Sequence, residues 1–504
     1  MRPLVPLLIS ISALAWLPPL AADVTLAPLF RDGAVLQRDQ PVPVWGRAAP
    51  GETVQVAFAG QSKTAIADAA GRWSVSLDPL SPAAAPRELD VHGRNRLRVP
   101  GILVGDVWLC SGQSNMNWKV RDAQNAPAEI ANATHPLIHY FGIANEVSDD
   151  PQDDTPGSWQ PASPDNAGDF SAVAYYFARE LQPHAGVPLG IIKATPGGSG
   201  IEAWMSPDDL DSIPEWPAIL AHRRKILAEF PAAQRAYEQA LAAWTAADEA
   251  AKKTGVPFTE VKPHVPEGPK SRNAPYGLFY SNINPLVPYA LRGILWYQGE
   301  GNASRYRQYR IFFPKLIAQW RHRFHEPDLP FLFVQLANFD LANDPTGEQW
   351  AFQREAQASV LTLPGTAMAV AIDVGDPRTI HPLNKQEVGR RLALLARRHV
   401  YGEPVEADSP RVSRFIASGS SLRVEFRDAQ GLTAHGQDIP DLQLAGADRQ
   451  FHPATARLDG EALIVSSPAV LHPVAVRYLW SNAPTATLFT AAGLPVAPFR
   501  SDNW

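Results

Sequence analysis

The chain has 504 residues, of which 45% are hydrophobic and 19% charged, values typical of a globular protein with two or three domains. Its net charge of -6 provides no basic surface for nucleic acid, which excludes that class of partner. Cys110 is the only cysteine, so an internal disulfide is excluded.

Residues 1–22 have the composition of a signal peptide. Arg2 precedes an apolar stretch that ends in small residues near Ala21 and Ala22, which is the order typical of a secretory signal. The alternative is a short membrane anchor, although the apolar core is short for a membrane span. No later stretch is long and apolar enough to cross a bilayer. We expect a periplasmic or secreted protein, since export without disulfides suits a bacterial periplasm or exterior.

Residues 23–100 have the pattern of a β-domain. Alternating runs such as Val54–Phe58 and Trp73–Leu77 are separated by turns rich in alanine, glycine and proline. Short strands at this spacing predict a small β-sandwich-like domain. No catalytic constellation occurs in this range, so we expect the domain to frame the part of the chain that follows.

Residues 101–403 alternate between strand-like and helix-like patterns, which predicts a three-layer α/β domain around a parallel sheet. The predicted strands are 104–110, 187–194, 291–297, 330–336 and 367–373. Three helices are predicted, the first at residues 171–182. The face of the second carries Tyr306, Tyr309, Phe313, Leu316 and Trp320. The face of the third carries Val388, Leu392, Leu395 and His399.

An Ala-rich, charged stretch at 206–270 interrupts the α/β pattern. It predicts a helical insertion in the form of a hairpin, with Pro231 at the start of the second helix. Such an insertion would wall a substrate cleft, make a dimer contact, or serve no function. Residues 404–504 return to strand patterns and predict a C-terminal β-domain. Its tail, Phe499–Trp504, has aromatic residues at both ends and is expected to dock on the protein.

The candidate nucleophile is Ser114. The run Val107–Cys110 predicts a buried strand, and the small and amide residues Ser111–Met116 follow it as a sharp turn. In open α/β sheets, the carboxyl ends of the strands carry the ligand and the chemistry. A serine hydroxyl at this point suits nucleophilic catalysis.

Three other polar stretches also end predicted strands. Gly197 and Gly198 allow backbone N–H groups to approach a ligand, as an oxyanion hole requires. Gln298 and Asn302, beside Glu300, offer neutral amide donors. His381 follows Asp373 and Asp376, and a histidine near a carboxylate can take the proton of a serine. Each stretch is weak evidence alone, but together they predict serine hydrolysis.

Several stretches of the chain, including the polar stretches above, resemble the motif blocks of the sialate O-acetylesterase family within the SGNH (GDSL-like) hydrolases. They are Ser111–Met116, Trp296–Glu300 with Asn302, Ile380–Lys385, Val35–Asp39 with Val44–Gly46, and Gly493–Pro495 with Phe499–Arg500. The resemblance implies a flavodoxin-like, SGNH-type sheet and the roles of Ser114 as nucleophile and His381 as base. It also implies an oxyanion hole formed by Gly198, by Gln298 and Asn302, and by the backbone N–H of Ser114.

Two positions depart from the family pattern. SGNH enzymes often place the triad acid three residues before the histidine, where this chain has Arg378. Asp376 is therefore the expected acid, with Asp373 as the second candidate and a dyad supported by a backbone carbonyl as the third. The glycine block reads Gly-Gly-Ser-Gly, so the choice between Gly197 and Gly198 stays open.

The expected function is removal of O-acetyl groups from carbohydrate through an acetyl-serine intermediate. The acetylated sugar is sialic acid or a plant cell-wall glycan such as xylan or xyloglucan, and the sequence does not choose between them. A non-catalytic carbohydrate-binding protein is the alternative of another class. We expect no cofactor and no metal. The run His322–Glu326 resembles metal-ligand spacing, but no third ligand is evident and the run lies near a helix end. The oligomeric state is not predicted.

Overall fold

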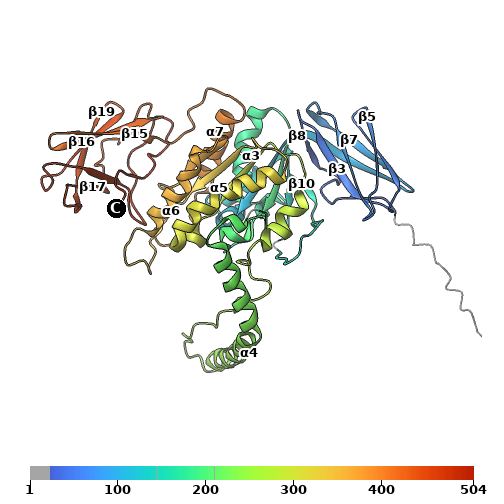
Figure 1. Cartoon of the computed structure of the whole chain (residues 1–504), viewed down its shortest axis with the longest axis horizontal. Helices are drawn as coiled ribbons and strands as arrows, with labels where there is room; N and C mark the ends of the chain where they lie inside the picture. The colour runs from blue at the N-terminus through green and yellow to red at the C-terminus, as the bar shows by residue number, and fades with distance from the viewer. Residues whose placement is uncertain (1–22, 145, 209) are drawn as a thin grey trace, which may run out of the picture.

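The computed structural model describes residues 23–144, 146–208 and 210–504. The predicted signal peptide lies outside this range. A β-domain at the N-terminal end and a second one at the C-terminal end flank a central α/β domain (Figure 1). Among the described residues, no helix is both long and apolar enough to span a membrane.

The N-terminal β-domain pairs two sheets around an apolar interior. One sheet contains β1 (Thr25–Leu26), β3 (Val42–Arg47) and β6 (Arg72–Leu77). The other contains β2 (Val35–Gln37), β4 (Thr53–Phe58), β5 (Gln61–Ile66), β7 (Ala83–His92) and the first part of β8 (Arg96–Gly112). Alternate residues of β4 and β6 are buried, as expected for strands with one face on a core.

Strand β8 belongs to two domains. Its first half pairs with β7 in the β-domain, and its second half is a central strand of the α/β sheet. The predicted boundary at residue 100 therefore falls inside one continuous strand. Every residue from Ile102 to Gly112 is buried, because this half of the strand is covered on both faces. The strand that ends at the candidate nucleophile is thus anchored in both domains.

The central sheet has the order β10-β9-β11-β8-β12-β13-β14. Its strands are β9 (His135–Gly142), β10 (Trp159–Ala162), β11 (Leu189–Ala194), β12 (Gly293–Tyr297), β13 (Phe331–Gln335) and β14 (Thr366–Val370). All neighbours pair in parallel except β10, which is antiparallel to β9. The five predicted strands are confirmed, whereas β9 and β10 were not predicted.

Helices cover both faces of this sheet. The helices are α3 (Ala172–Ala185), α5 (Tyr306–Arg323), α6 (Gln349–Ala358) and α7 (Lys385–His399). Apolar residues of α3 and α7 share one buried cluster with one face of the sheet, and those of α5 share another with the opposite face. The three predicted helices are confirmed, and α6 is an addition. The mixed α/β class is therefore confirmed.

The predicted helical hairpin is wrong. One helix, α4 (Trp216–Thr254), runs through the whole range and contains Pro231 in its interior. Figure 1 shows α4 leaving the α/β domain and bending before its end. A proline inside a helix removes one hydrogen bond and kinks the helix without ending it. The chain then returns as a loop along α4, where the indole Nε1 of Trp244 donates to the carbonyl of Glu260 at 2.9 Å.

The C-terminal β-domain consists of two four-stranded sheets. One has the order β15-β16-β20-β19, from β15 (Arg411–Ser418), β16 (Ser421–Arg427), β20 (Ala462–Ser466) and β19 (Thr455–Asp459). The other has the order β18-β17-β21-β22, from β18 (Phe451–Pro453), β17 (Leu442–Ala445), β21 (Ala475–Tyr478) and β22 (Phe499–Arg500). The expected docking of the tail is confirmed, because Arg500 binds Glu355 of α6 through two hydrogen bonds of 2.8 and 3.0 Å.

Candidate active site

Ser114 lies where the central strand β8 meets the short helix α1 (Ser114–Asn117). Gly112 makes this turn possible: its φ is 135°, and a Cβ atom there would lie 2.1 Å from the carbonyl oxygen of Tyr297. Only glycine fits such a position. The next amide, that of Gln113, donates to the same carbonyl at 3.0 Å. Ser114 therefore stands at the carboxyl end of the sheet, where β8 lies between β11 and β12.

His381 meets Ser114 from the loop between β14 and α7. Its Nε2 atom lies 2.8 Å from the Ser114 hydroxyl oxygen. The imidazole ring stacks on the Trp118 indole, with 4.9 Å between ring centroids and 23° between planes. Burial lowers the pKa of His381, and the positive charge of Lys385 lowers it further. The imidazole is therefore neutral at neutral pH and able to accept the hydroxyl proton.

The structure does not bring the predicted acid Asp376 to His381. The Arg378 guanidinium holds the Asp376 carboxylate through hydrogen bonds of 3.0 and 2.9 Å, and this pairing lowers the pKa of the carboxyl. The second candidate, Asp373, is held by Arg391 at 2.6 and 2.7 Å. Among the described residues, no hydrogen bond reaches the Nδ1 atom of His381. The structure thus contains a serine–histidine pair without a carboxylate behind it.

Replacing Asp376 with asparagine tests this arrangement. We expect kcat/KM for acetate release to change by less than about threefold, whereas loss of a triad carboxylate costs about 10,000-fold. The expectation rests on the exposed Asp376–Arg378 pair, which does not contact the imidazole. Steady-state kinetics of the Asp376→Asn enzyme decide the matter. A loss of about 1,000-fold or more would place Asp376 on His381 during the reaction.

The glycine block lies directly beside the nucleophile. A Cβ atom at Gly197 would lie 3.3 Å from the Ser114 Cβ, whereas a Cβ atom at Gly198 would meet open space. Gly198 has a φ of 69°, in the left-handed region that favours glycine. Among the described residues, neither the amide of Gly198 nor that of Ser114 donates to a protein acceptor. Both N–H groups are thus free to bind a ligand next to Ser114.

Gln298 and Asn302 form a scaffold behind the glycine block. Both side chains are completely buried. The amide of Gln298 donates one hydrogen bond to the carbonyl of Ser199 at 3.1 Å and another to the Asn302 Oδ1 atom at 2.8 Å. Asn302 also accepts from the backbone amide of Ile201 at 2.9 Å and donates to Glu202 at 3.1 Å. Because both of its N–H groups are engaged, Gln298 holds the loop in place and has no donor left for an oxyanion.

A buried polar network lies beneath the serine–histidine pair. Asn115 donates to Glu300 and to the carbonyl of Ile380, the residue before His381, and it accepts a hydrogen bond from Lys385. Lys385 has no exposed surface, and burial lowers its pKa to about 7. Burial also raises the pKa of Glu300. The network connects three segments: the turn that carries Ser114, the loop that carries His381, and the segment after β12 that contains Glu300.

Replacing Lys385 with methionine is expected to change the pH profile of the reaction. Below pH 7 the Lys385 ammonium is charged and opposes protonation of His381. Without this charge, the pKa of His381 rises, so the base becomes protonated and inactive at a higher pH. The acidic limb of kcat/KM against pH should therefore move to higher pH. The contradicting result is an acidic limb at the wild-type pH in a methionine variant whose melting temperature is unchanged. It would show that the charge of Lys385 does not affect the pKa of His381.

Three residues of this site had no role in the sequence analysis. Trp118 supports the imidazole of His381, Asn115 links the three loops, and Lys385 supplies the buried charge. Asn115 and Lys385 lie within the motif blocks, and Trp118 follows Ser114 by four positions. Their closeness to the motif blocks was the only signal in the sequence that could have identified these residues. The stacking of Trp118 and the hydrogen bonds of Asn115 and Lys385 depend on the tertiary structure, so the sequence alone does not predict them.

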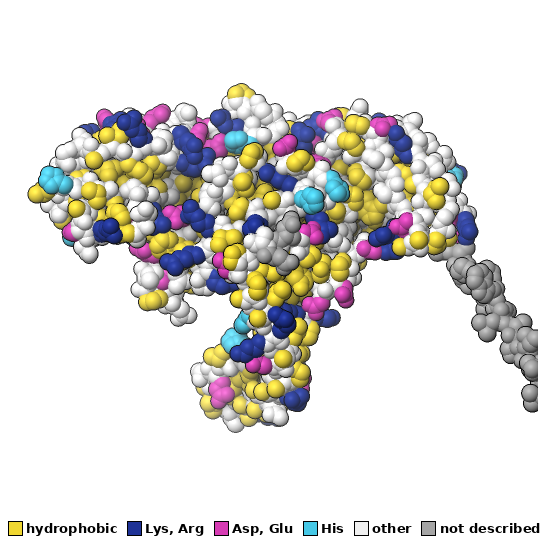
Figure 2. All heavy atoms as spheres, in the orientation of Figure 1, with side chains coloured by type: hydrophobic (Ala, Val, Ile, Leu, Met, Phe, Trp, Pro, Cys, Tyr) yellow, Lys and Arg dark blue, Asp and Glu magenta, His cyan; other side chains and the backbone are white. Residues whose placement is uncertain are grey.

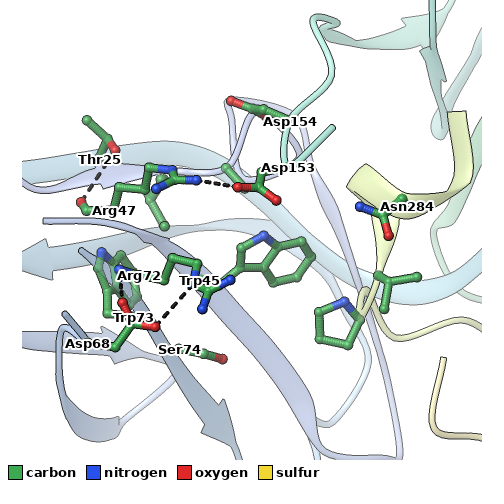
Figure 3. A pocket seen from close by; sticks show the side chains of 15 residues that line it. Thr25, Trp45, Arg47, Asp68, Arg72, Trp73, Ser74, Asp153, Asp154 and Asn284 are labelled. Carbon is green, nitrogen blue, oxygen red and sulfur yellow. Dashed lines mark hydrogen bonds and ion pairs between the residues drawn. The ribbon is translucent and has the colours of Figure 1, made fainter. Parts of the chain in front are cut away.

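A separate cavity of about 450 Å³ lies between the N-terminal β-domain and two loops of the α/β domain. Trp45 lines it together with charged and amide side chains, and none of the predicted site residues lies in it (Figure 3). Its arginines are paired, Arg47 with Asp153 and Arg72 with Asp68. This cavity therefore lacks the nucleophile and the base found at the sheet edge. In the described part of the chain, no cluster of three or more histidine, cysteine or acidic residues could hold a metal ion.

The fold and this site define a class of protein. A serine hydroxyl on a neutral imidazole, next to free backbone N–H groups at the edge of a parallel sheet, is the arrangement of α/β enzymes that cleave esters.

Comparisons with known proteins assign the family. Residues 266–396 match the family model of carbohydrate esterase, sialic acid-specific acetylesterase. The chain is 30% identical to sialate O-acetylesterase of Mus musculus, over 90% of each chain. It is 27% identical to sialate O-acetylesterase of Homo sapiens, over 90% of this chain and 88% of the human protein. It is also similar to the crystal structure of a carbohydrate acetylesterase from Xanthomonas citri, with a TM-score of 0.79 and 39% identity, covering 95% of this chain and 100% of that one.

The chain belongs to the sialate O-acetylesterase family, and it is a carbohydrate O-acetylesterase. The resemblance based on the motif blocks is therefore confirmed.

Proposed function

We propose that this enzyme removes O-acetyl groups from carbohydrate by a serine mechanism, with Ser114 as nucleophile and His381 as general base. The observation that carries the proposal is the 2.8 Å contact between the His381 Nε2 atom and the Ser114 hydroxyl. His381 takes the hydroxyl proton while the oxygen attacks the acetyl carbonyl carbon. The same proton then passes to the departing sugar oxygen, and water hydrolyses the acetyl-serine with His381 again as base.

The proposed oxyanion hole consists mainly of backbone groups. The amides of Ser114 and Gly198 donate to no protein acceptor among the described residues, and Gly197, next to Gly198, packs on Ser114. The second amide hydrogen of Asn302 is the third proposed donor, whereas Gln298 positions the loop. When His381 becomes protonated, the stacked face of Trp118 stabilises its charge in place of a carboxylate.

The fold supports a more specific class. We propose an SGNH-type, three-layer α/β domain, because the strand order β11-β8-β12-β13-β14 places Ser114 where the chain connections reverse direction. We further propose export to the periplasm or exterior, on the basis of the signal-like sequence of residues 1–22. The acetylated sugar is either sialic acid or a neutral cell-wall glycan.

Acetate release from a panel of acetylated sugars tests the proposal. The panel contains O-acetylated sialic acid, acetylated xylan and acetylated xyloglucan oligosaccharides, each with wild type and with Ser114→Ala. We expect release by the wild type from at least one member, and its loss in the variant. Release that Ser114→Ala leaves intact would contradict the serine mechanism.

A further inference from the structure

We propose that the cavity between helix α4 and the active-site loops is a subsite for a neutral sugar of the acetylated glycan. This inference rests on the proposed function, since it assigns the part of the substrate that extends from Ser114. The cavity has a volume of about 540 Å³, within the range of about 300–1,000 Å³ for small-molecule sites. It is lined by one face of α4 and by residues near the glycine and Asn302 blocks.

Hydrogen bonds connect this cavity to the nucleophile. Gly197 packs on Ser114, and the Arg272 guanidinium donates to the carbonyl of Gly197 at 3.1 Å. The next residue, Asn273, lines the cavity and accepts a hydrogen bond from the amide of Gly200 at 2.9 Å. The residues 271–273 thus belong to the cavity wall and to the support of the glycine block. In the proposed complex, a glycan with its acetyl group at Ser114 extends across this short segment into the cavity.

A second connection runs through Glu202. Its carboxylate lines the cavity, yet its side chain is 6% exposed. One carboxylate oxygen accepts from Asn302 at 3.1 Å, and the other accepts from Arg305 at 2.6 Å. The floor of the cavity is therefore the outer side of the scaffold that supports the glycine block.

The charges of the cavity favour a neutral ligand. Both arginines that line it are engaged: Arg305 by Glu202, and Arg223 by the carbonyls of Gly268 and Pro269. Three carboxylates, those of Glu202, Glu215 and Glu267, also line the cavity. Acidic side chains beside engaged cations suit hydroxyl donors and disfavour a carboxylate such as that of sialic acid.

The remaining residues of the cavity wall offer both apolar and polar contacts to a sugar ring. Ile219, Ile226 and Pro275 provide apolar contact for ring C–H groups, and Gln308 provides an amide. Figure 2 shows acidic, basic and histidine side chains where the projecting α4 region meets the α/β domain. The insertion between residues 206 and 270 thus forms one wall of a substrate cleft.

Filling the cavity tests the proposal. Ala218 is exposed on α4 and lines the cavity, whereas Ala228 is exposed on the same helix and does not line it. We compare Ala218→Trp with the control Ala228→Trp on an acetylated neutral oligosaccharide, on O-acetylated sialic acid and on 4-nitrophenyl acetate. Ala218→Trp should raise KM for the neutral oligosaccharide about tenfold or more, because the indole occupies the sugar position. It should leave 4-nitrophenyl acetate unchanged, and Ala228→Trp should leave all three unchanged.

Three outcomes would overturn the inference. Ala218→Trp could leave KM for the neutral oligosaccharide unchanged, could slow 4-nitrophenyl acetate to the same extent, or could affect only the sialic acid substrate. Failure of the proposed function has a different signature. In that case the wild type would cleave 4-nitrophenyl acetate but release no acetate from any carbohydrate.

Discussion

Replacing Ser114 with alanine is expected to lower kcat for acetate release by about 100,000-fold or more, since nucleophile loss in a serine hydrolase costs about a million-fold. The variant keeps the backbone turn at Gly112 and the free amides, so the substrate still binds and KM should change little. The oxygen that forms the acetyl bond is gone, and His381 has no hydroxyl to deprotonate. Steady-state release of acetate at saturating substrate gives the measurement.

Ser111 provides a matched control within the same motif. Its hydroxyl is buried and donates to the carbonyl of Ala194 at 2.8 Å, on the strand and away from His381. Ser111→Ala should cost about 1 kcal/mol of folding free energy and little activity. If Ser114→Ala retained more than about one-hundredth of wild-type kcat, the nucleophile would have to be another group.

Replacing His381 with alanine is expected to lower kcat by a similar factor, about 10,000- to 1,000,000-fold, because no other base among the described residues contacts the Ser114 hydroxyl. The variant leaves a space against the Trp118 ring, where the imidazole is stacked in the wild type. Added imidazole should enter this space and restore part of the activity. The dependence of acetate release on imidazole concentration is the measurement.

His399 provides the control for this variant. It lies at the other end of α7 and binds Asp408 at 2.8 Å, far along the helix from Lys385. His399→Ala should keep wild-type kcat. A His381→Ala enzyme with activity near that of wild type would exclude His381 as the base.

The position of the site was predictable because its residues follow buried strands. The runs that end at Cys110, Ala194 and Tyr297 are apolar apart from Lys193, which identifies interior strands of a parallel sheet. The carboxyl ends of such strands share one edge, so Ser114 and the block after β12 had to lie together. The local sequence alone could not predict the partner of the imidazole. Asp376 is near His381 in sequence, but Arg378 is nearer to Asp376 and takes its carboxylate.

Helix α6 was missed because its buried face is partly polar. Gln353, Arg354 and Gln357 are buried there, so the sequence shows no apolar periodicity. Their partners are far away in the chain: Arg354 donates to the carbonyls of Leu336 and Ser481, and Gln357 donates to that of Gln298. A helix stabilised by such long-range hydrogen bonds is evident only in the folded structure. α4 was misjudged for another reason, since Pro231 is compatible with a helix start and with a kink.

The central claim is that Ser114 carries the acetyl group during the reaction. Rapid quenching of the enzyme in its first turnovers, followed by peptide mass spectrometry, tests this claim most directly. The account predicts one acetyl group on the peptide that contains Ser114, formed before steady state and lost as acetate appears. An acetyl group on a different residue, or acetate release from an enzyme that Ser114→Ala does not impair, would contradict it.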